Sequence, residues 1–174
     1  MLMISIMDID KKAQHHHAHR LLRECLRPYG VPEEAAIERM EYGKPYLRDF
    51  PELHFNLSHG SGIAACIVTD TECGIDCEQC REMREGVVRR CFSPAEKRLL
   101  EEIPESERDL MFTRLWTLKE AFVKCIGKGI GYPMDTAEFA FEGSRIVTAP
   151  KGYRFSQYIL RGGRYVCSTA VSSR

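Results

Sequence analysis

Net charge, long apolar runs and linker-like stretches are all missing from this 174-residue sequence. Its 25 Lys and Arg residues balance 25 Asp and Glu residues, so no excess positive field exists to attract nucleic acid. The longest apolar stretches fall far short of the roughly 18 residues that a membrane span needs, so no membrane partner is expected. The opening residues lack the basic segment of a signal peptide, and eight cysteines are then expected to stay reduced in the cytoplasm.

Apolar residues are plentiful, at 44% of the sequence. A chain of this length is expected to bury about 70% of its unfolded surface, in one core or in two small packed lobes. Residues 19–30 are amphipathic at helical period, and Pro32 predicts a second helix over residues 33–40. Residues 53–60, 62–70 and 72–78 are strand-like with turn residues between them, which favours antiparallel pairing in sequence order.

The second half repeats this order of elements. Ser93 and Glu96 form a capping box at the start of a helix, and a longer helix follows and ends at Gly127. The last third alternates as strands. The sequence therefore predicts an α+β fold of two similar lobes, each with helices and an antiparallel β-meander. The expected N-terminal lobe covers residues 1–85 and the C-terminal lobe residues 86–174, in one continuous two-lobe domain.

Two acids lie on one face of the strand at residues 74–78. Asp76 and Glu78 are two positions apart, about 7 Å along a strand, which is close enough to bind one cation. A third acid, Glu120, shares a helical stripe with Trp116 and Lys124, and this stripe is expected to face inward. Three carboxylates suit Mg²⁺ or Mn²⁺. A network of salt bridges with no metal is the alternative.

A second group of polar residues surrounds a glycine turn. Neighbours on a strand point to opposite faces, so Ser58 and His59 are poorly placed for a catalytic dyad, and a phosphate-binding role fits better. Lys44 and Arg20 offer further cations for a polyphosphate, although each could be an ordinary surface cation. The histidine run at residues 15–19 could bind a metal or form the polar face of a helix.

The cysteine spacing allows two other interpretations. Cys73, Cys77 and Cys80 have a C-x3-C-x2-C spacing that can hold an iron–sulfur cluster, and with Cys91 they could hold zinc. Cys77 would point away from the acids of its strand, and the paired C-x2-C spacing of zinc sites is missing. Buried, reduced cysteines that act as small apolar residues are therefore preferred.

Five segments together resemble the 4′-phosphopantetheinyl transferase superfamily, in its surfactin-synthetase-activating type. They are GKPYL at 43–47, HFNLSHG at 54–60, GIDCE at 74–78, RRCFSPAE at 89–96 and LWTLKEAFVKCIGKG at 115–129, with a weaker AHR at 18–20. Each motif alone is modest. The combination of G-I-D-x-E and, about forty residues later, W-x-x-K-E-A-x-x-K-x-x-G-x-G is highly specific.

The resemblance implies a holo-[acyl-carrier-protein] synthase type of reaction and a fold of two pseudo-symmetric lobes with coenzyme A between them. The phosphopantetheine arm of coenzyme A would move to a serine of an apo carrier protein, and adenosine 3′,5′-bisphosphate would be released. By this match, Asp76, Glu78 and Glu120 would hold Mg²⁺, or Mn²⁺, on the pyrophosphate. Glu120 would also accept the serine proton.

The same match implies roles for the basic residues. Lys124 would stabilise phosphate charge, and Lys119 would contact phosphate or brace the site. The nucleotide end of coenzyme A, its 3′-phosphate above all, would be held by Arg20, Lys44, Ser58 and His59. The chain is expected to act as a monomer, because it would contain both lobes of its cleft.

Carrier proteins are generally acidic, so a basic or apolar docking patch is expected. The segment from 84 to 98 is the candidate, with Arg84, Arg89, Arg90, Phe92 and Arg98 as its main residues. A module that binds coenzyme A or the carrier without catalysis is the alternative function. Such a module would keep the basic contacts and lose an acid, whereas all three acids are present.

Overall fold

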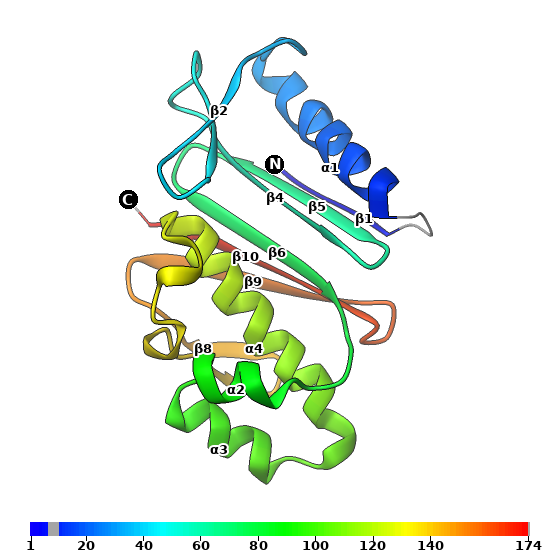
Figure 1. The fold of residues 1–174 in the computed structure, drawn as a ribbon, viewed down its shortest axis with the longest axis vertical. Helices are drawn as coiled ribbons and strands as arrows, with labels where there is room; N and C mark the ends of the chain where they lie inside the picture. The colour runs from blue at the N-terminus through cyan, green and yellow to red at the C-terminus, as the bar shows by residue number, and fades with distance from the viewer. Residues whose placement is uncertain (7–10, 174) are drawn as a thin grey trace.

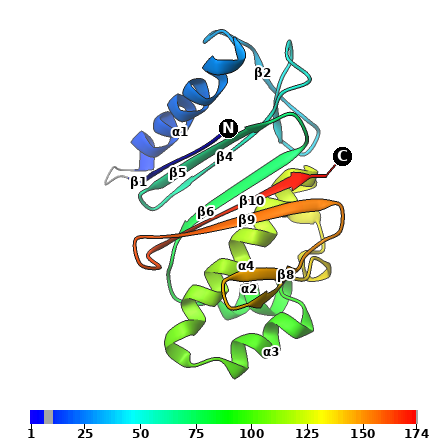
Figure 2. The ribbon, with the colours of Figure 1, turned by 180° about the vertical axis from the view of Figure 1, so that it is seen from behind.

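Two three-stranded antiparallel sheets form the centre of the molecule (Figure 1). The computed structural model describes residues 1–6 and 11–173. The first sheet has the strand order β1-β5-β4 and the second the order β6-β10-β9. Their strands are β1 (Leu2–Ile6), β4 (His54–Gly60), β5 (Ile63–Thr69), β6 (Cys73–Gln79), β9 (Tyr153–Leu160) and β10 (Tyr165–Ser172). Seen from behind, β9 forms the far edge of the second sheet (Figure 2).

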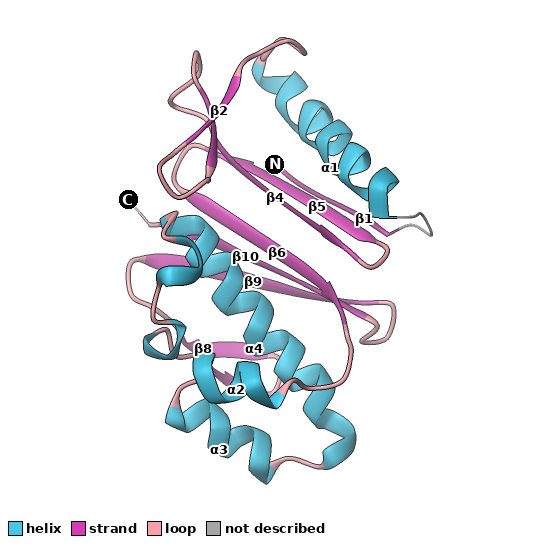
Figure 3. Cartoon of the chain, in the orientation of Figure 1, coloured by secondary structure: helices cyan, strands magenta, loops and turns pink. Residues whose placement is uncertain are grey.

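Each sheet carries one long helix on its outer side, α1 (Lys11–Leu26) on the first and α4 (Glu105–Ile126) on the second (Figure 3). A small hairpin follows each helix: β2 (Ile37–Arg39) with β3 (Pro45–Leu47), and β7 (Ala140–Glu142) with β8 (Arg145–Thr148). Both lobes thus run strand, helix, hairpin and two strands, with the same strand order. The predicted α+β fold of two pseudo-symmetric lobes is confirmed.

Shorter helices complete the chain. They are α2 (Glu85–Cys91), α3 (Pro94–Glu102) and the 3₁₀ turns η1 (Arg27–Tyr29), η2 (Gly129–Gly131) and η3 (Met134–Thr136). Ser93 caps α3 with the predicted capping box, and α4 ends at Gly127 in the left-handed conformation. The prediction of a helix over residues 33–40 is wrong, because Ile37 pairs with Leu47 in a β-hairpin.

β5 is buried on both faces, as its nearly continuous apolar sequence suggests. Ala64, Cys66 and Val68 pack under α1. On the other face, Ile63, Ala65 and Ile67 meet Ile75 and Cys77 of β6 in an apolar layer between the two sheets. The layers are therefore helix, sheet, sheet and helix.

The two sheets divide the chain earlier than expected. The third strand of the series, β6, was expected to pair with β5, but it pairs with β10, with Asp76 opposite Ser168. β6 therefore belongs to the C-terminal sheet, and the chain crosses between sheets at residues 70–72 rather than near residue 85. The turn that suggested a hairpin is instead the connection between the lobes.

Candidate functional site

The close packing of β6 against α4 creates the site. An added Cβ at Gly74 would lie 2.0 Å from the carbonyl oxygen of Ala121 and 2.4 Å from the amide nitrogen of Cys125. Only a glycine permits this approach. Asp76 and Glu78 follow Gly74 on the face towards α4, so they are brought close to Glu120 and Lys124 of the helix.

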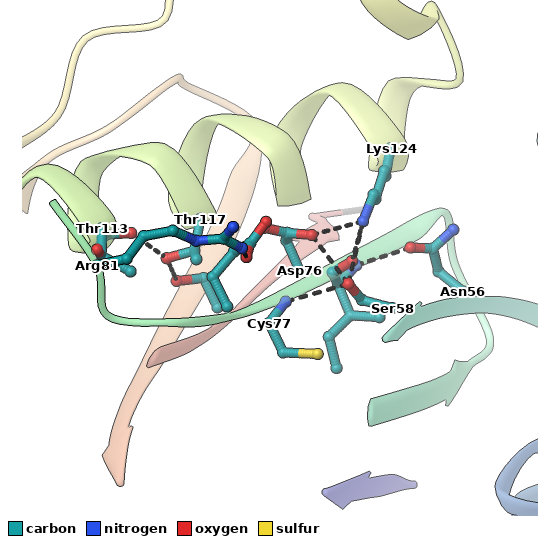
Figure 4. A network of polar contacts seen from close by, with 11 residues as sticks. Asn56, Ser58, Asp76, Cys77, Arg81, Thr113, Thr117 and Lys124 are labelled. Carbon is teal, nitrogen blue, oxygen red and sulfur yellow. Dashed lines mark hydrogen bonds and ion pairs between the residues drawn. The ribbon is translucent and has the colours of Figure 1, made fainter. Parts of the chain in front are cut away.

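Asp76 is the centre of the polar network (Figure 4). Its Oδ1 accepts hydrogen bonds from Lys124 Nζ at 2.6 Å and from Ser58 Oγ at 2.9 Å. Its Oδ2 is buried and has no hydrogen-bond partner among the described residues. Since a buried carboxylate oxygen is normally paired, this atom is available for a further ligand.

The ionisation of the site is set by its own charges. Burial raises the pKa of Glu120 to about 7, and the negative charge of Asp76 contributes in the same direction. Burial lowers the pKa of Lys124, but its ion pair with Asp76 outweighs that effect, and the pKa is raised overall. Glu120 is thus poised to exchange a proton near neutral pH, beside a lysine that stays charged.

Ser58 and Asn56 connect the two lobes. Ser58 Oγ accepts a hydrogen bond from the amide of Cys77 at 3.2 Å, and Asn56 Oδ1 accepts one from the amide of Ile75 at 2.9 Å. Ser58 also donates to Asp76 and accepts from Lys124 at 3.3 Å. Its hydroxyl thus has three partners inside the protein and positions Asp76, while its expected contact with a nucleotide phosphate stays a prediction.

A cavity of about 300 Å³ opens between the lobes beside this network. Its walls include Lys44 and Asn56 of the first lobe and Glu120, Lys124 and Met134 of the second. A neighbouring cavity of about 680 Å³ shares part of this wall. The shared residues are Tyr42, Lys44 and Gly127. The two cavities are therefore neighbours, and Glu120 lines the smaller one.

Lys44 lies at the junction of the two cavities and is almost fully buried, at 8% exposure. Its ammonium group forms an ion pair with Glu72 and donates to the carbonyl oxygen of Cys125 at 2.6 Å. The expected cation is therefore at the cleft, with a carboxylate partner that the sequence did not suggest.

Arg20 and His59 lie outside the residues that line the two cavities. Arg20 is exposed and contacts His17 at 2.9 Å. His59 is exposed, on the opposite side of its strand from buried Ser58, which agrees with the predicted alternation. Its ring lies 5.5 Å from that of His15 of α1. Within the histidine run, His15, His16 and His19 are exposed, as a polar helix face would be.

Lys119 is buried in the second lobe, and it does not line either cavity. Its ammonium is fully buried, pairs with Glu96 at 2.8 Å, and donates to the carbonyl oxygens of Met134 and Ala137 at 2.9 and 2.6 Å. Every proton of this ammonium has a partner within the protein, which agrees with the bracing role that was the alternative to a phosphate contact. Lys119 braces the site, because Met134 is part of the cavity wall.

The expected docking patch is mostly exposed. Arg84, Arg89, Arg90 and Arg98 are all accessible. Phe92 is not, since it is fully buried and its ring stacks on Phe112 at 5.6 Å. Phe92 therefore belongs to the core of the second lobe, and its inclusion in the patch is wrong. A groove of about 400 Å³ runs beside Val88 and Arg89.

The cysteines do not form a common site. Cys73 and Cys77 point into the apolar layer between the sheets, whereas Cys91 lies in the core of the second lobe. Burial raises the pKa of Cys73 to about 11 and of Cys77 to about 12. These thiols act as small apolar side chains, as preferred above.

More than half of the chain matches one protein family. The family model described as the 4′-phosphopantetheinyl transferase superfamily matches residues 72–170, which include β6, α4, β9 and most of β10. The chain belongs to the 4′-phosphopantetheinyl transferase superfamily.

Individual relatives in this superfamily agree. A 4′-phosphopantetheinyl transferase of Bacillus subtilis is 35% identical over 111 residues, which are 63% of this chain and 50% of that protein. The 4′-phosphopantetheinyl transferase HetI of a Nostoc species is 38% identical over 141 residues, 75% of this chain and 59% of that protein. The chain thus spans about half the length of the curated relatives it matches. A holo-[acyl-carrier-protein] synthase structure from Thermotoga maritima aligns with a TM-score of 0.49 and 23% identity, over 60% of this chain and 64% of that one.

The superfamily resemblance implies a divalent metal ion at Asp76, Glu78 and Glu120. Within residues 1–6 and 11–173, no three His, Cys, Asp or Glu side chains are already grouped as a metal site. The carboxylates of Asp76, Glu78 and Glu120 nevertheless are the oxygen donors that Mg²⁺ prefers, and Oδ2 of Asp76 is buried and unused among the described atoms. These residues fit a divalent cation.

Two further members of the site were missed by the sequence analysis. Asn56 precedes Ser58 by two positions, so strand alternation could have placed both on one face. Arg81 lies three residues after Glu78 and binds it at 2.5 Å. No signal in the sequence distinguished Arg81 from other surface arginines.

In the described part of the chain, no helix is long and apolar enough to cross a membrane.

Proposed function

We propose that this protein transfers the phosphopantetheine arm of coenzyme A to a serine of an apo carrier protein. The observation that carries the proposal is the cleft in which Glu120, with a pKa near 7, lies beside the Lys124–Asp76 ion pair in a chain of this superfamily. Two neighbouring cavities, of about 300 and 680 Å³, offer room for a large cosubstrate such as coenzyme A.

Glu120 acts as the general base in this proposal. It accepts the proton of the carrier serine, directly or through a water molecule, so that the serine oxygen can attack the phosphorus that bears the pantetheine arm. The new oxygen–phosphorus bond forms as the pyrophosphate bond breaks. The electron pair of that bond leaves with adenosine 3′,5′-bisphosphate, and Lys124 stabilises the charge that develops on the phosphate oxygens.

Asp76, Glu78 and Glu120 would hold the divalent cation, Mg²⁺ or Mn²⁺, which would neutralise the charge of the pyrophosphate. Ser58 and Lys124 hold the Asp76 carboxylate in place from its other oxygen. Lys44, at the junction of the two cavities, binds the nucleotide end of coenzyme A in this proposal, and His59 and Arg20 remain candidates for its 3′-phosphate.

The carrier protein docks on the basic face formed by Arg84, Arg89, Arg90 and Arg98 in this proposal. These side chains are exposed, and Arg84 lies over the ring of Trp116, 5.7 Å from its centroid, on the same helix as Glu120. A basic surface at this place would lead an acidic carrier to the catalytic carboxylate. The protein acts as a monomer in this proposal, since two lobes of one chain form the cleft, and its eight free cysteines suit the reducing cytoplasm.

Intact-protein mass spectrometry tests the reaction. The protein is incubated with coenzyme A, Mg²⁺ and a panel of apo carrier proteins, with a chelator in the control. A carrier mass gain of one phosphopantetheine that disappears with chelator supports the proposal. No gain despite coenzyme A binding would favour the non-catalytic module, and neither gain nor binding would contradict both functions.

A further inference from the structure

Two cations neutralise the carboxylates of β6 from opposite sides. Lys124 binds Oδ1 of Asp76 at 2.6 Å, and Arg81 binds Oε2 of Glu78 at 2.5 Å. Figure 4 shows Lys124 bound to Asp76, and Arg81 on the other side of Asp76 in that view. The superfamily motif accounts for Lys124, but it does not account for Arg81.

The two cations differ in how firmly they are held. Lys124 has three partners, since its ammonium also contacts Ser58 Oγ and the carbonyl oxygen of Ile75 at 3.2 Å. Arg81 is 50% exposed, and the structure records its contact with Glu78 in the segment that follows β6. A long, half-exposed side chain can leave its partner for water with little penalty. Lys124 is therefore the fixed cation and Arg81 the exchangeable one.

The two acids also differ in what a metal ion would meet. Asp76 already offers Oδ2, which is buried and without a partner in the described structure, while Lys124 keeps Oδ1. At Glu78 the guanidinium occupies the oxygen Oε2. A divalent cation can therefore approach Asp76 without any exchange, but it must displace Arg81, or bind beside its positive charge, to use Glu78.

We infer that Arg81 is a built-in competitor of the divalent cation at Glu78 and thereby lowers the metal affinity of the site. The inference rests on the metal-binding part of the proposed function. Arg81 keeps Glu78 neutralised when the metal is absent, and it turns outward when the metal binds. Metal affinity is then set by a residue that is not itself a ligand.

The experiment compares Mn²⁺ binding to Arg81→Ala, Arg81→Lys and the wild type by electron paramagnetic resonance at low salt. Arg145→Ala is the matched control, because Arg145 forms the same type of pair with Glu142, also at 2.5 Å and three residues apart, in the β7–β8 hairpin. We expect Arg81→Ala to bind Mn²⁺ about three- to tenfold more tightly, and the difference to shrink at high salt. Arg81→Lys is expected to stay nearer to the wild type.

The outcomes separate this inference from the proposed function. Tighter binding by Arg81→Ala and unchanged binding by Arg145→Ala would support it. Equal Mn²⁺ affinity of Arg81→Ala and wild type would overturn it and leave the proposed metal site intact. Wild-type protein that binds no Mn²⁺ would overturn both the inference and the proposed metal site. Glu78→Gln shows whether Glu78 is a ligand, and it should bind Mn²⁺ more weakly than the wild type.

Discussion

Lys124 Nζ lies 2.6 Å from one carboxylate oxygen of Asp76, while the other oxygen of the same group is buried and lacks a partner among the residues that the structure describes. One side of the carboxylate is thus used to fix its position and the other is left for a ligand. This division explains how a single acid can be held rigidly and still serve a metal ion.

Replacement of Asp76 by Asn tests that division. Asn keeps an oxygen for Lys124 and Ser58 but removes the negative charge, so we expect transfer to fall about 100-fold or more, with the fold retained. The measurement is carrier modification by mass spectrometry, with circular dichroism as the check of folding. Ser58→Ala, which removes only a supporting hydrogen bond, is expected to lose about 10-fold. Near wild-type turnover of Asp76→Asn would show that this acid is not a ligand.

Glu120→Gln should change stability in a pH-dependent way. The pKa of Glu120 rises from 4.5 to about 7 on folding, so the unfolded chain loses this proton at lower pH than the folded protein. Ionisation of Glu120 therefore destabilises the folded wild-type protein. This effect is absent below about pH 4.5, grows as the pH rises, and is complete above about pH 7. Urea unfolding with chelator present should show Glu120→Gln to be more stable by about 2–3 kcal/mol at pH 8 and much less so at pH 5. An equal gain at both pH values would contradict the assigned ionisation.

Lys119→Met should destabilise the protein by about 3–5 kcal/mol, because it leaves the carboxylate of Glu96 buried without its cation. The double variant Lys119→Met/Glu96→Gln should regain part of this loss, since no buried charge remains. Urea unfolding of both variants gives the coupling energy. A loss of transfer by Lys119→Met with an unchanged unfolding midpoint would instead restore its role as a phosphate contact.

Gly74→Ala should separate β6 from α4. Its Cβ would meet backbone atoms of Ala121 and Cys125 that cannot move aside independently, so we expect a loss of about 3 kcal/mol or more, and weaker transfer. Gly86→Ala is the control, because Gly86 lies in helix α2 and an added Cβ there would meet nothing within 4 Å. A small gain of about 0.5–1 kcal/mol is expected for it. Equal unfolding midpoints for the two variants would be evidence against the close contact.

Charge reversal at Arg89 or Arg90 tests the docking face. We expect Arg89→Glu and Arg90→Glu to raise KM for an acidic carrier severalfold and to leave KM for coenzyme A unchanged, because both side chains are exposed and outside the cavities at Glu120. The effect should weaken as salt is added. An unchanged carrier KM in both variants would place the docking surface elsewhere.

Local patterns were sufficient to predict much of this molecule. Strand alternation placed Asp76 and Glu78 on one face, and the capping box located the start of α3. The partner of β6 was not predictable in this way, because β10 lies about ninety residues later and its pairing depends on the assembled core. The turn before β6 gave a stronger local signal, and it suggested the wrong neighbour.

Side-chain direction on the long helix shows the same limit. Lys119 and Glu120 are adjacent, so the motif alone brings both to attention, yet a helix turns neighbouring residues to different sides. Which side meets the cleft depends on where β6 packs. Phe92 is a similar case, since its place among exposed arginines suggested a surface, whereas its contact with Phe112 requires the tertiary structure.

Beside the apolar layer between the sheets, the Asn56 amide and the Ser58 hydroxyl bind the backbone amides of Ile75 and Cys77 across the lobes. Backbone ladders between strands tolerate almost any side chain, because the main chain is the same at every position. The contacts of Asn56 and Ser58 have no such tolerance, because each depends on one side chain. A substitution at either position would leave the apolar layer between the sheets in place and remove a hydrogen bond that aligns β4 with β6, so the alignment of the cleft depends on the identity of single residues.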